Sequence, residues 1–380
     1  MSAQAKHCKP DRAPVLSRPA VPLARQTPLA LVRCAQILIC SLAIALAGCS
    51  PPETGPEYID DYLQRLARTL NTPVPVSDKL WAPPRLQDAG VAKLPIPGSK
   101  LDVLDFLSLS GCALQVNLGR RNSSLGRTAS PSQQLLLDLE FLALAPACIA
   151  TLVDQGKTDI AAQLVDAQST RTAFLRQRIF NALLAGPEYS RFWKLPPKLQ
   201  AYPDQVGGRV IEALHWFNQA IRMWLEGRYE FQVDQLETQL YHLRSGDGGS
   251  LLLAAVVQAR ILEQATAAVD ARGDSAPLCP QNLTTGTAKT LATVVVKYFA
   301  GQVQPWLARL HQRQRALMPP ILGIEAQLEP ALPEAYRQWL SMRDATLATL
   351  GSMPRQHVAA LQRLGASCPG GLLSAQTPQT

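Results

Sequence analysis

Residues 209–243 read RVIEALHWFNQAIRMWLEGRYEFQVDQLETQLYHL, and their apolar side chains recur at helical spacing. The mean period of about 3.7 residues is close to that of a straight α-helix. We therefore predict one rod of roughly 50 Å near the centre of the fold, which Gly227 could bend. The apolar positions are Val210, Leu214, Phe217, Ile221, Leu225, Tyr229, Val233, Leu236, Leu240 and Leu243.

The same spacing extends outward from this stretch in both directions. Ser130 and Pro131 supply a cap and a first-turn proline for one helix, which Pro146 should kink or end. Segment 291–299 is rich in Val and Thr and also fits a strand, but it stands alone among helices. We predict an all-α protein, an elongated multi-helix bundle. Its other helices are expected near residues 57–70, 100–118, 158–185, 250–271, 284–300, 302–318, 333–350 and 354–365.

A proline-rich segment and the composition of the two chain ends suggest the boundaries between the parts of the chain. Residues 71–99 carry six prolines at a spacing that no helix tolerates, so they form an ordered wrap or a flexible arm. Trp81 and Leu94 indicate that this arm packs down on the fold. The predicted organisation is a leader at 1–48, a tether at 49–56, one helical domain at 57–368 and a disordered tail at 369–380.

Cys49 ends the stretch Leu46-Ala47-Gly48-Cys49, which resembles the lipobox of bacterial lipoproteins. A basic leader and a charge-free apolar run from residue 34 precede it, as in a signal peptide. We expect cleavage before Cys49, acylation of that residue and anchoring in the bilayer. A signal anchor and a buried helix of a cytosolic protein are the alternatives. Ser50 follows the cysteine, and a residue other than Asp there favours the outer membrane.

Charge and cysteine content fit that location. The leader carries six Lys and Arg residues and one Asp, so its removal lowers the formal net charge from +8 to +3. Binding to nucleic acid therefore loses its main support. Four cysteines remain beyond Cys49, an even number that suggests disulfides in an oxidising compartment. We favour Cys112–Cys148 and Cys279–Cys368, because each pair lies in one half of the chain; free buried thiols are the alternative.

One segment stands out as a candidate ligand site. Residues 119–127 offer three guanidinium groups, two hydroxyls, an amide and two glycines, which suit a phosphate or carboxylate. The structural alternative is a solvated connection between helices. The candidate ligand-binding residues are Arg120, Arg121, Asn122, Ser123, Ser124 and Arg127.

Other groups give weaker signals. The histidines lack metal-ligand spacing, and no hydrolase, zinc-protease or phosphate-loop motif is present. A basic region near Trp306 fits either a solvated helix face or lipid headgroups. Its members are Lys297, Arg309, His311, Arg313 and Arg315. No catalytic residue, metal or cofactor is predicted. We expect a non-catalytic binding or scaffold role with an envelope protein as partner; the alternative is an envelope enzyme or a receptor for a small anion.

Several motifs also resemble those of a known family of gammaproteobacterial lipoproteins, which is catalogued only as a domain of unknown function. The resemblance covers essentially the whole mature chain. It implies an envelope location and brings no catalytic residues. The motifs are Ser110-Gly111-Cys112, the run from Arg121 through Asn122, Ser123, Ser124 and Leu125 to Gly126, Cys148, Cys279-Pro280, and Gln304-Pro305-Trp306-Leu307.

Overall fold

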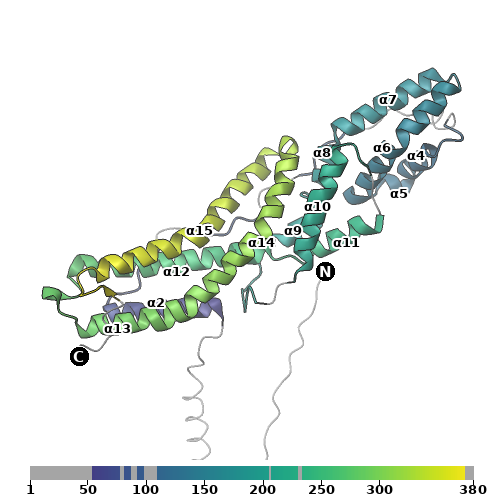
Figure 1. The fold of residues 1–380 in the computed structure, drawn as a ribbon. Helices are drawn as coiled ribbons and strands as arrows, with labels where there is room; N and C mark the ends of the chain where they lie inside the picture. The colour runs from purple at the N-terminus through teal and green to yellow at the C-terminus, as the bar shows by residue number, and fades with distance from the viewer. Residues whose placement is uncertain are drawn as a thin grey trace, which may run out of the picture. The chain divides into compact units, whose positions relative to one another are not determined.

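The computed structural model describes residues 54–372, apart from 78–80, 87–91, 98–108, 205–206 and 230–232. Its regular structure within those residues is helical, and no strand occurs among them (Figure 1). The all-α prediction is confirmed. The predicted leader, Cys49 and the tail from residue 373 lie outside the described residues.

The first described helix, α2 (Gly55–Leu70), follows the predicted pattern. The side chain of Glu57 accepts a hydrogen bond of 2.9 Å from the backbone N–H of Thr54, which fixes the start of the helix. Ile59, Leu63 and Leu66 lie on one buried stripe, and that stripe packs against the long helix α12 (Gly248–Ser275). A regular apolar period was sufficient to place this element.

The described parts of the proline-rich segment form an ordered strap over the helices. Gln264 donates a hydrogen bond of 2.9 Å to the carbonyl of Pro75, and the Trp81 indole donates one of 2.7 Å to Glu263. Further along, Leu94 exchanges two hydrogen bonds with the side chain of Asn181, of 2.7 and 2.8 Å. Of the two possibilities, an ordered wrap or a flexible arm, the structure has the wrap.

A group of packed helices of different lengths follows the strap. These are α4 (Leu114–Asn122), α5 (Ser124–Arg127), α6 (Pro131–Asp154), α7 (Thr158–Ala173), α8 (Leu175–Ala182) and α9 (Pro187–Phe192). The predicted cap is confirmed, because the Ser130 side chain accepts from the N–H of Gln133 at 3.2 Å. The predicted helix at 100–118 is only partly testable, and its described end is a turn until Leu114. Pro146 lies on an exposed face of α6, which continues past it to Asp154.

The predicted central rod is wrong. It is two helices, α10 (Arg209–Leu225) and α11 (Val233–Arg244), which pack against each other. Gly227 lies between them with φ of +84°, a left-handed conformation that ends a helix. Because an isolated glycine costs a helix only about 1 kcal/mol, the sequence pattern alone could not decide between a bend and a break.

The C-terminal part is built on long helices. The helix α12 packs along α15 (Glu334–Gly365), and Figure 1 shows the two side by side. Between them in the sequence come α13 (Gly286–Val294), the π-helix η3 (Val295–Val303) and α14 (Gln304–Leu328), with short 3₁₀ turns at Pro280–Asn282 and Glu329–Ala331. The Val-rich segment is therefore helical, as predicted. The two helices expected at 333–350 and 354–365 are one, because α15 continues through Pro354.

Both predicted disulfides are present. Cys112 pairs with Cys148 and ties the turn before α4 to α6, with 5.7 Å between the α-carbons. Cys279 pairs with Cys368 and ties the loop after α12 to the segment just after α15, with 4.9 Å between the α-carbons. Each half of the chain carries one covalent link.

Two stretches of the described chain are long and apolar enough to cross a membrane by length and composition alone. One is α6, and the other is Asp234–Ser275, which includes the turn between α11 and α12. Within the fold, α6 packs against α7 and α8, and α12 packs against α2 and α15. Core helices of this kind pass the same test, so the finding is weak evidence for a membrane span.

Candidate functional site

The predicted loop at 119–127 is mostly helical. Arg120, Arg121 and Asn122 form the last turn of α4, and residues 124–127 form α5. Ser123 joins the two helices: its hydroxyl donates to the carbonyl of Arg120 at 2.7 Å and accepts from the N–H of Gly126 at 3.0 Å. Ser123 is therefore committed to capping α5.

Arg120 and Arg121 point to different partners. Arg120 forms an ion pair with Glu140 on α6. Asn117 supports that pair, since its side-chain amide donates to Glu140 at 2.7 Å and to the carbonyl of Leu137 at 3.0 Å. This half of the predicted site is a structural link between α4 and α6.

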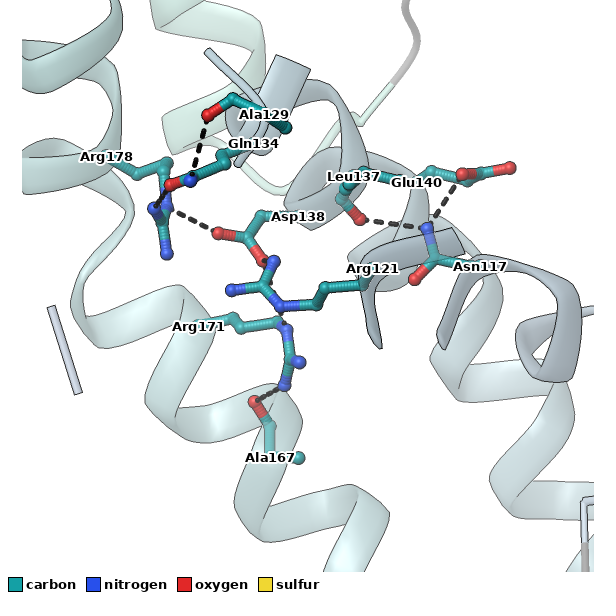
Figure 2. A network of polar contacts seen from close by, with 10 residues as sticks. All are labelled: Asn117, Arg121, Ala129, Gln134, Leu137, Asp138, Glu140, Ala167, Arg171 and Arg178. Atoms are coloured by element: carbon teal, nitrogen blue, oxygen red, sulfur yellow. Dashed lines mark hydrogen bonds and ion pairs between the residues drawn. The ribbon is translucent and has the colours of Figure 1, made fainter. Parts of the chain in front are cut away.

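Arg121 turns instead toward Asp138, a carboxylate that sequence reasoning missed. The Asp138 side chain is only 5% exposed, and three arginines from three helices converge on it (Figure 2). Arg121 Nη1 lies 2.5 Å and Arg171 Nε 3.3 Å from Oδ1. Arg178 Nε lies 2.6 Å from Oδ2. We call these four residues the Asp138 cluster.

Surrounding groups hold the arginines in place. Gln134 accepts a hydrogen bond of 2.8 Å from Arg178 Nη1 and donates one of 3.1 Å to the carbonyl of Ala129. Arg171 donates from Nη1 to the carbonyl of Ala167 at 3.1 Å, and its guanidinium carbon lies 3.7 Å from the centre of the Phe141 ring. Planar guanidinium groups suit such combined stacking and hydrogen bonding.

The cluster gathers three arginines around one carboxylate in poorly solvated surroundings. Burial lowers the pKa of Arg171 to about 10, Asp138 offsets part of that effect, and the nearby charges of Arg121 and Arg178 lower the pKa further. Burial also lowers the pKa of Arg178, again with a contribution from Arg121. A pKa near 10 still leaves Arg171 charged at neutral pH. The lowered pKa values come mainly from burial, and Asp138 offsets only part of them.

A small cavity of about 10 Å³ lies at the cluster. The side chains of Arg121, Asp138, Arg171 and Arg178 line it, together with Thr170 of α7, Phe174 between α7 and α8, and Ile96 and Pro97 of the strap. The two hydrogen bonds between the Leu94 backbone and the Asn181 side chain hold the strap beside the cavity. The strap therefore borders the cavity and is held in place there.

The remaining predicted residues lie elsewhere. Arg120, Ser123 and Gly126 line an open groove of about 360 Å³ between α4–α5 and α6, whose lining is mainly apolar. Leu125 projects beside it with 83% of its surface exposed. Asn122, Ser124 and Arg127 are exposed and line neither space. The structure thus divides the six predicted residues rather than bringing them together.

Some other ionisable groups are also paired or buried. Arg313, predicted as part of a basic surface, is buried and bound to Asp247, while Arg309 forms an exposed pair with Asp204. His357 is fully buried between Tyr62 and Thr266, at 2.7 and 3.1 Å. No group of three or more metal-ligating side chains occurs among the described residues.

A family model described as "Protein of unknown function (DUF3080)" matches residues 59–369. That range includes both disulfides, the Asp138 cluster and the motifs at residues 110–126 and 304–307. No curated protein and no solved structure matches the chain.

Proposed function

Because the chain belongs to this family, whose description gives no activity, we propose from its own residues that it is an envelope lipoprotein with a non-catalytic binding or scaffold role. In this proposal, acylated Cys49 anchors the protein in the outer membrane and the helical part faces the periplasm. The observation that carries the proposal is the sequence Leu46-Ala47-Gly48-Cys49 after a charge-free apolar run.

The physical basis of the anchor is addition of acyl chains. Each buried methylene contributes about 0.8 kcal/mol, so one chain holds a protein marginally and several chains hold it durably. Two features of the structure support this location. Both disulfides are formed, which suits an oxidising compartment. The first described helix starts at Gly55, so the tether that follows Cys49 is short.

Metabolic labelling with a palmitate analogue and fractionation test the anchor. The wild-type protein should take label and sediment with outer membranes, whereas Cys49→Ala should take none and become soluble. Ser50→Asp should keep the label but move the protein to the inner membrane, because Asp after the acylated cysteine is the usual retention signal. Full membrane retention of Cys49→Ala, together with a wild-type protein that takes no label, would contradict the proposal.

A non-catalytic role is supported by how the interior carboxylates are used. Asp138 and Glu325 are each nearly buried, and each is bound to arginine from another helix. Such pairs fix the arrangement of helices and occupy both carboxylates with arginine, so neither is a free group for acid–base catalysis. This leaves the outer surface of a permanently anchored helical protein as the part available for interaction.

Crosslinking in intact envelopes, followed by denaturing purification and mass spectrometry, tests the scaffold role. We expect one identified envelope protein at near-stoichiometric yield with the wild type and a much lower yield with Cys49→Ala at equal abundance. Recovery of no partner above the yield with an unrelated lipoprotein would contradict the role.

The alternative, an enzyme or small-anion receptor built on residues 119–127, loses part of its basis. Arg120 and Arg121 already pair with Glu140 and Asp138, and Ser123 caps α5. Turnover of a substrate that is lost in Arg121→Ala, with unchanged thermal stability, would restore it.

A further inference from the structure

Close packing fixes the point at which the chain enters the folded part. Gly55, the first residue of α2, lies against the indole of Trp306 in the first turn of α14, and a β-carbon at this glycine would be 2.0 Å from the indole nitrogen. That nitrogen donates a hydrogen bond of 3.0 Å to the carbonyl of Tyr202, between α9 and α10. Gly55 comes six positions after Cys49, so their α-carbons can lie at most about 20 Å apart.

Polar contacts join this entry point to two further parts of the chain. The Tyr202 hydroxyl donates a hydrogen bond of 2.8 Å to Asp247, in the turn between α11 and α12. Arg309, on the α14 turn after Trp306, pairs with Asp204 at 2.8 Å. The start of α2, the start of α14, the α9–α10 connection and the α11–α12 turn therefore meet at one place.

Close backbone contacts bring the end of α9 and the start of α10 to the same place. A β-carbon at Gly246 would lie 2.8 Å from the Val210 side chain, and one at Gly249 would lie 2.1 Å from the carbonyl oxygen of Lys194. In agreement, α11 packs against both α9 and α10, and α10 packs against α14 (Figure 1). We call the described residues at this place the tether face: 54–57, 193–204, 207–210, 244–249 and 304–309.

The tether face carries more exposed positive than negative charge. Its acids are mostly engaged: Asp204 and Asp247 each pair with an arginine, and Glu57 accepts from the backbone N–H at the start of α2. Four of its exposed cations form no ion pair with any residue that the structure describes. They are Lys194, Lys198, Arg209 and Arg244.

We propose that the tether face lies against the membrane surface and that these four cations bind anionic lipid headgroups. The short chain between Cys49 and Gly55 keeps this face within reach of the bilayer. Lys and Arg side chains are attracted to an anionic leaflet, and the attraction falls off within about 10 Å at ordinary salt. By contrast, α12 is 28 residues long, so its far end is about 42 Å from the tether face.

This contact rests on the proposed function in one respect, namely that a membrane holds the N-terminal end of the chain. Palmitate labelling reports on the anchor, whereas the measurements below report on the face that meets the lipid, so each can fail alone. A labelled protein that presents another face would overturn only the contact. An unlabelled protein that stays membrane-bound and presents the tether face would overturn only the acylated anchor. A protein that never sediments with membranes would overturn both.

Fluorescence quenching in vesicles identifies the face. The full chain is purified from membranes, reconstituted and labelled at one added cysteine, with the signal of the labelled wild type subtracted. Gly208→Cys places the reporter beside Arg209, and Gly286→Cys places it beyond the far end of α12; a β-carbon at either glycine has no atom within 4 Å. A lipid with a nitroxide headgroup should quench most of the fluorescence at Gly208→Cys and little at Gly286→Cys. Equal quenching, or stronger quenching at Gly286→Cys, would overturn the proposal.

Lipid charge tests the role of the cations. Phosphatidylglycerol vesicles should quench the Gly208→Cys reporter more than phosphatidylcholine vesicles, and salt of about 1 M should remove the difference because it shortens the screening length to about 3 Å. Lys198→Gln with Arg209→Gln should also remove it. The control, Lys157→Gln with Lys289→Gln, makes the same charge change at the α6–α7 turn and on α13 and should keep it. Equal quenching in the two lipids, or a difference that survives Lys198→Gln with Arg209→Gln, would contradict binding by these side chains.

Discussion

The hydroxyl of Tyr62 lies 2.7 Å from Nε2 of His357, across 295 positions of the chain. Tyr62 is on the first described helix and His357 on the last, so the contact joins the two ends of the folded part. Thr266 of α12 lies 3.1 Å from the other ring nitrogen. A neutral imidazole has one donor and one acceptor nitrogen, which these two hydroxyls satisfy.

Acid should destabilise the fold through His357. Burial lowers the pKa of His357 from 6.5 to about 3, so the unfolded chain binds a proton more readily than the folded chain. The stabilising effect of the neutral ring is complete above about pH 6.5. It is lost as the pH falls toward 3, by up to about 1.4 kcal/mol per pH unit. Urea unfolding from pH 7.5 to 4.5 measures this slope.

The matched variants identify the residue responsible for that slope. His357→Gln should flatten the pH dependence, while His215→Gln on the exposed face of α10 should leave it unchanged. Equal slopes for the wild type and His357→Gln would assign the acid sensitivity to other groups.

Removing Arg343 should cost far more than removing a nearby surface arginine. Arg343 is fully buried on α15 and forms two hydrogen bonds with Glu325, of 2.5 and 2.9 Å. Arg343→Met leaves a buried carboxylate uncompensated, at a cost of about 3–5 kcal/mol of unfolding free energy. Arg337→Met on the same helix breaks only the exposed pair with Glu329, worth about 1 kcal/mol or less. Similar losses for both variants in chemical unfolding would contradict this account.

Gly126 should not tolerate a side chain. A β-carbon there would lie 2.1 Å from the carbonyl oxygen of Arg120, so α5 would have to move away from α4. We expect Gly126→Ala to lower the unfolding free energy by about 1–3 kcal/mol. The control is Gly286→Ala at the start of α13, where no atom lies within 4 Å and the change should be neutral or slightly stabilising. The prediction fails if the two melting temperatures shift alike.

Loss of the Cys112–Cys148 disulfide should lower the free energy of unfolding without changing the arrangement of the helices. Replacing Cys112 and Cys148 together by Ala should cost about 2–4 kcal/mol, since the bond closes a loop with a sequence separation of 36. Non-reducing peptide mass spectrometry of the wild type should recover Cys112–Cys148 and Cys279–Cys368 peptides. A Cys112–Cys279 peptide would show that the pairing is different in the cell.

Local signals in the sequence predicted the elements that depend on local chemistry. The apolar stripe of α2 and the Ser130 cap of α6 follow from spacing and from one side-chain hydrogen bond. The helix breaks depend on tertiary packing instead. Gly227 ends a helix, whereas Pro354 lies within one, and neither outcome follows from the residue type alone.

Only part of the candidate site could be predicted, because its contacts also depend on tertiary packing. Arg121 is a candidate ligand-binding residue because it stands in an arginine-rich segment. Its partner Asp138 lies 17 positions away, in the apolar run LLLDLEF. An acid within such an apolar run is a signal for a buried ion pair, and it was available in the sequence. The convergence of Arg171 and Arg178 on the same carboxylate depends on the break between α7 and α8 at Phe174. The sequence pattern did not indicate this break.

The two disulfides also decide what a protease would release. A cut between Cys148 and Cys279 separates the chain into two polypeptides even when both bonds are intact. A cut within residues 113–147 or 280–367 leaves a single covalently linked molecule until a reductant is added. If Cys49 anchors the protein as proposed, the first kind of cut would leave the C-terminal half attached only through noncovalent packing, such as that of α2 against α12. The second kind would keep a covalent link to the anchor.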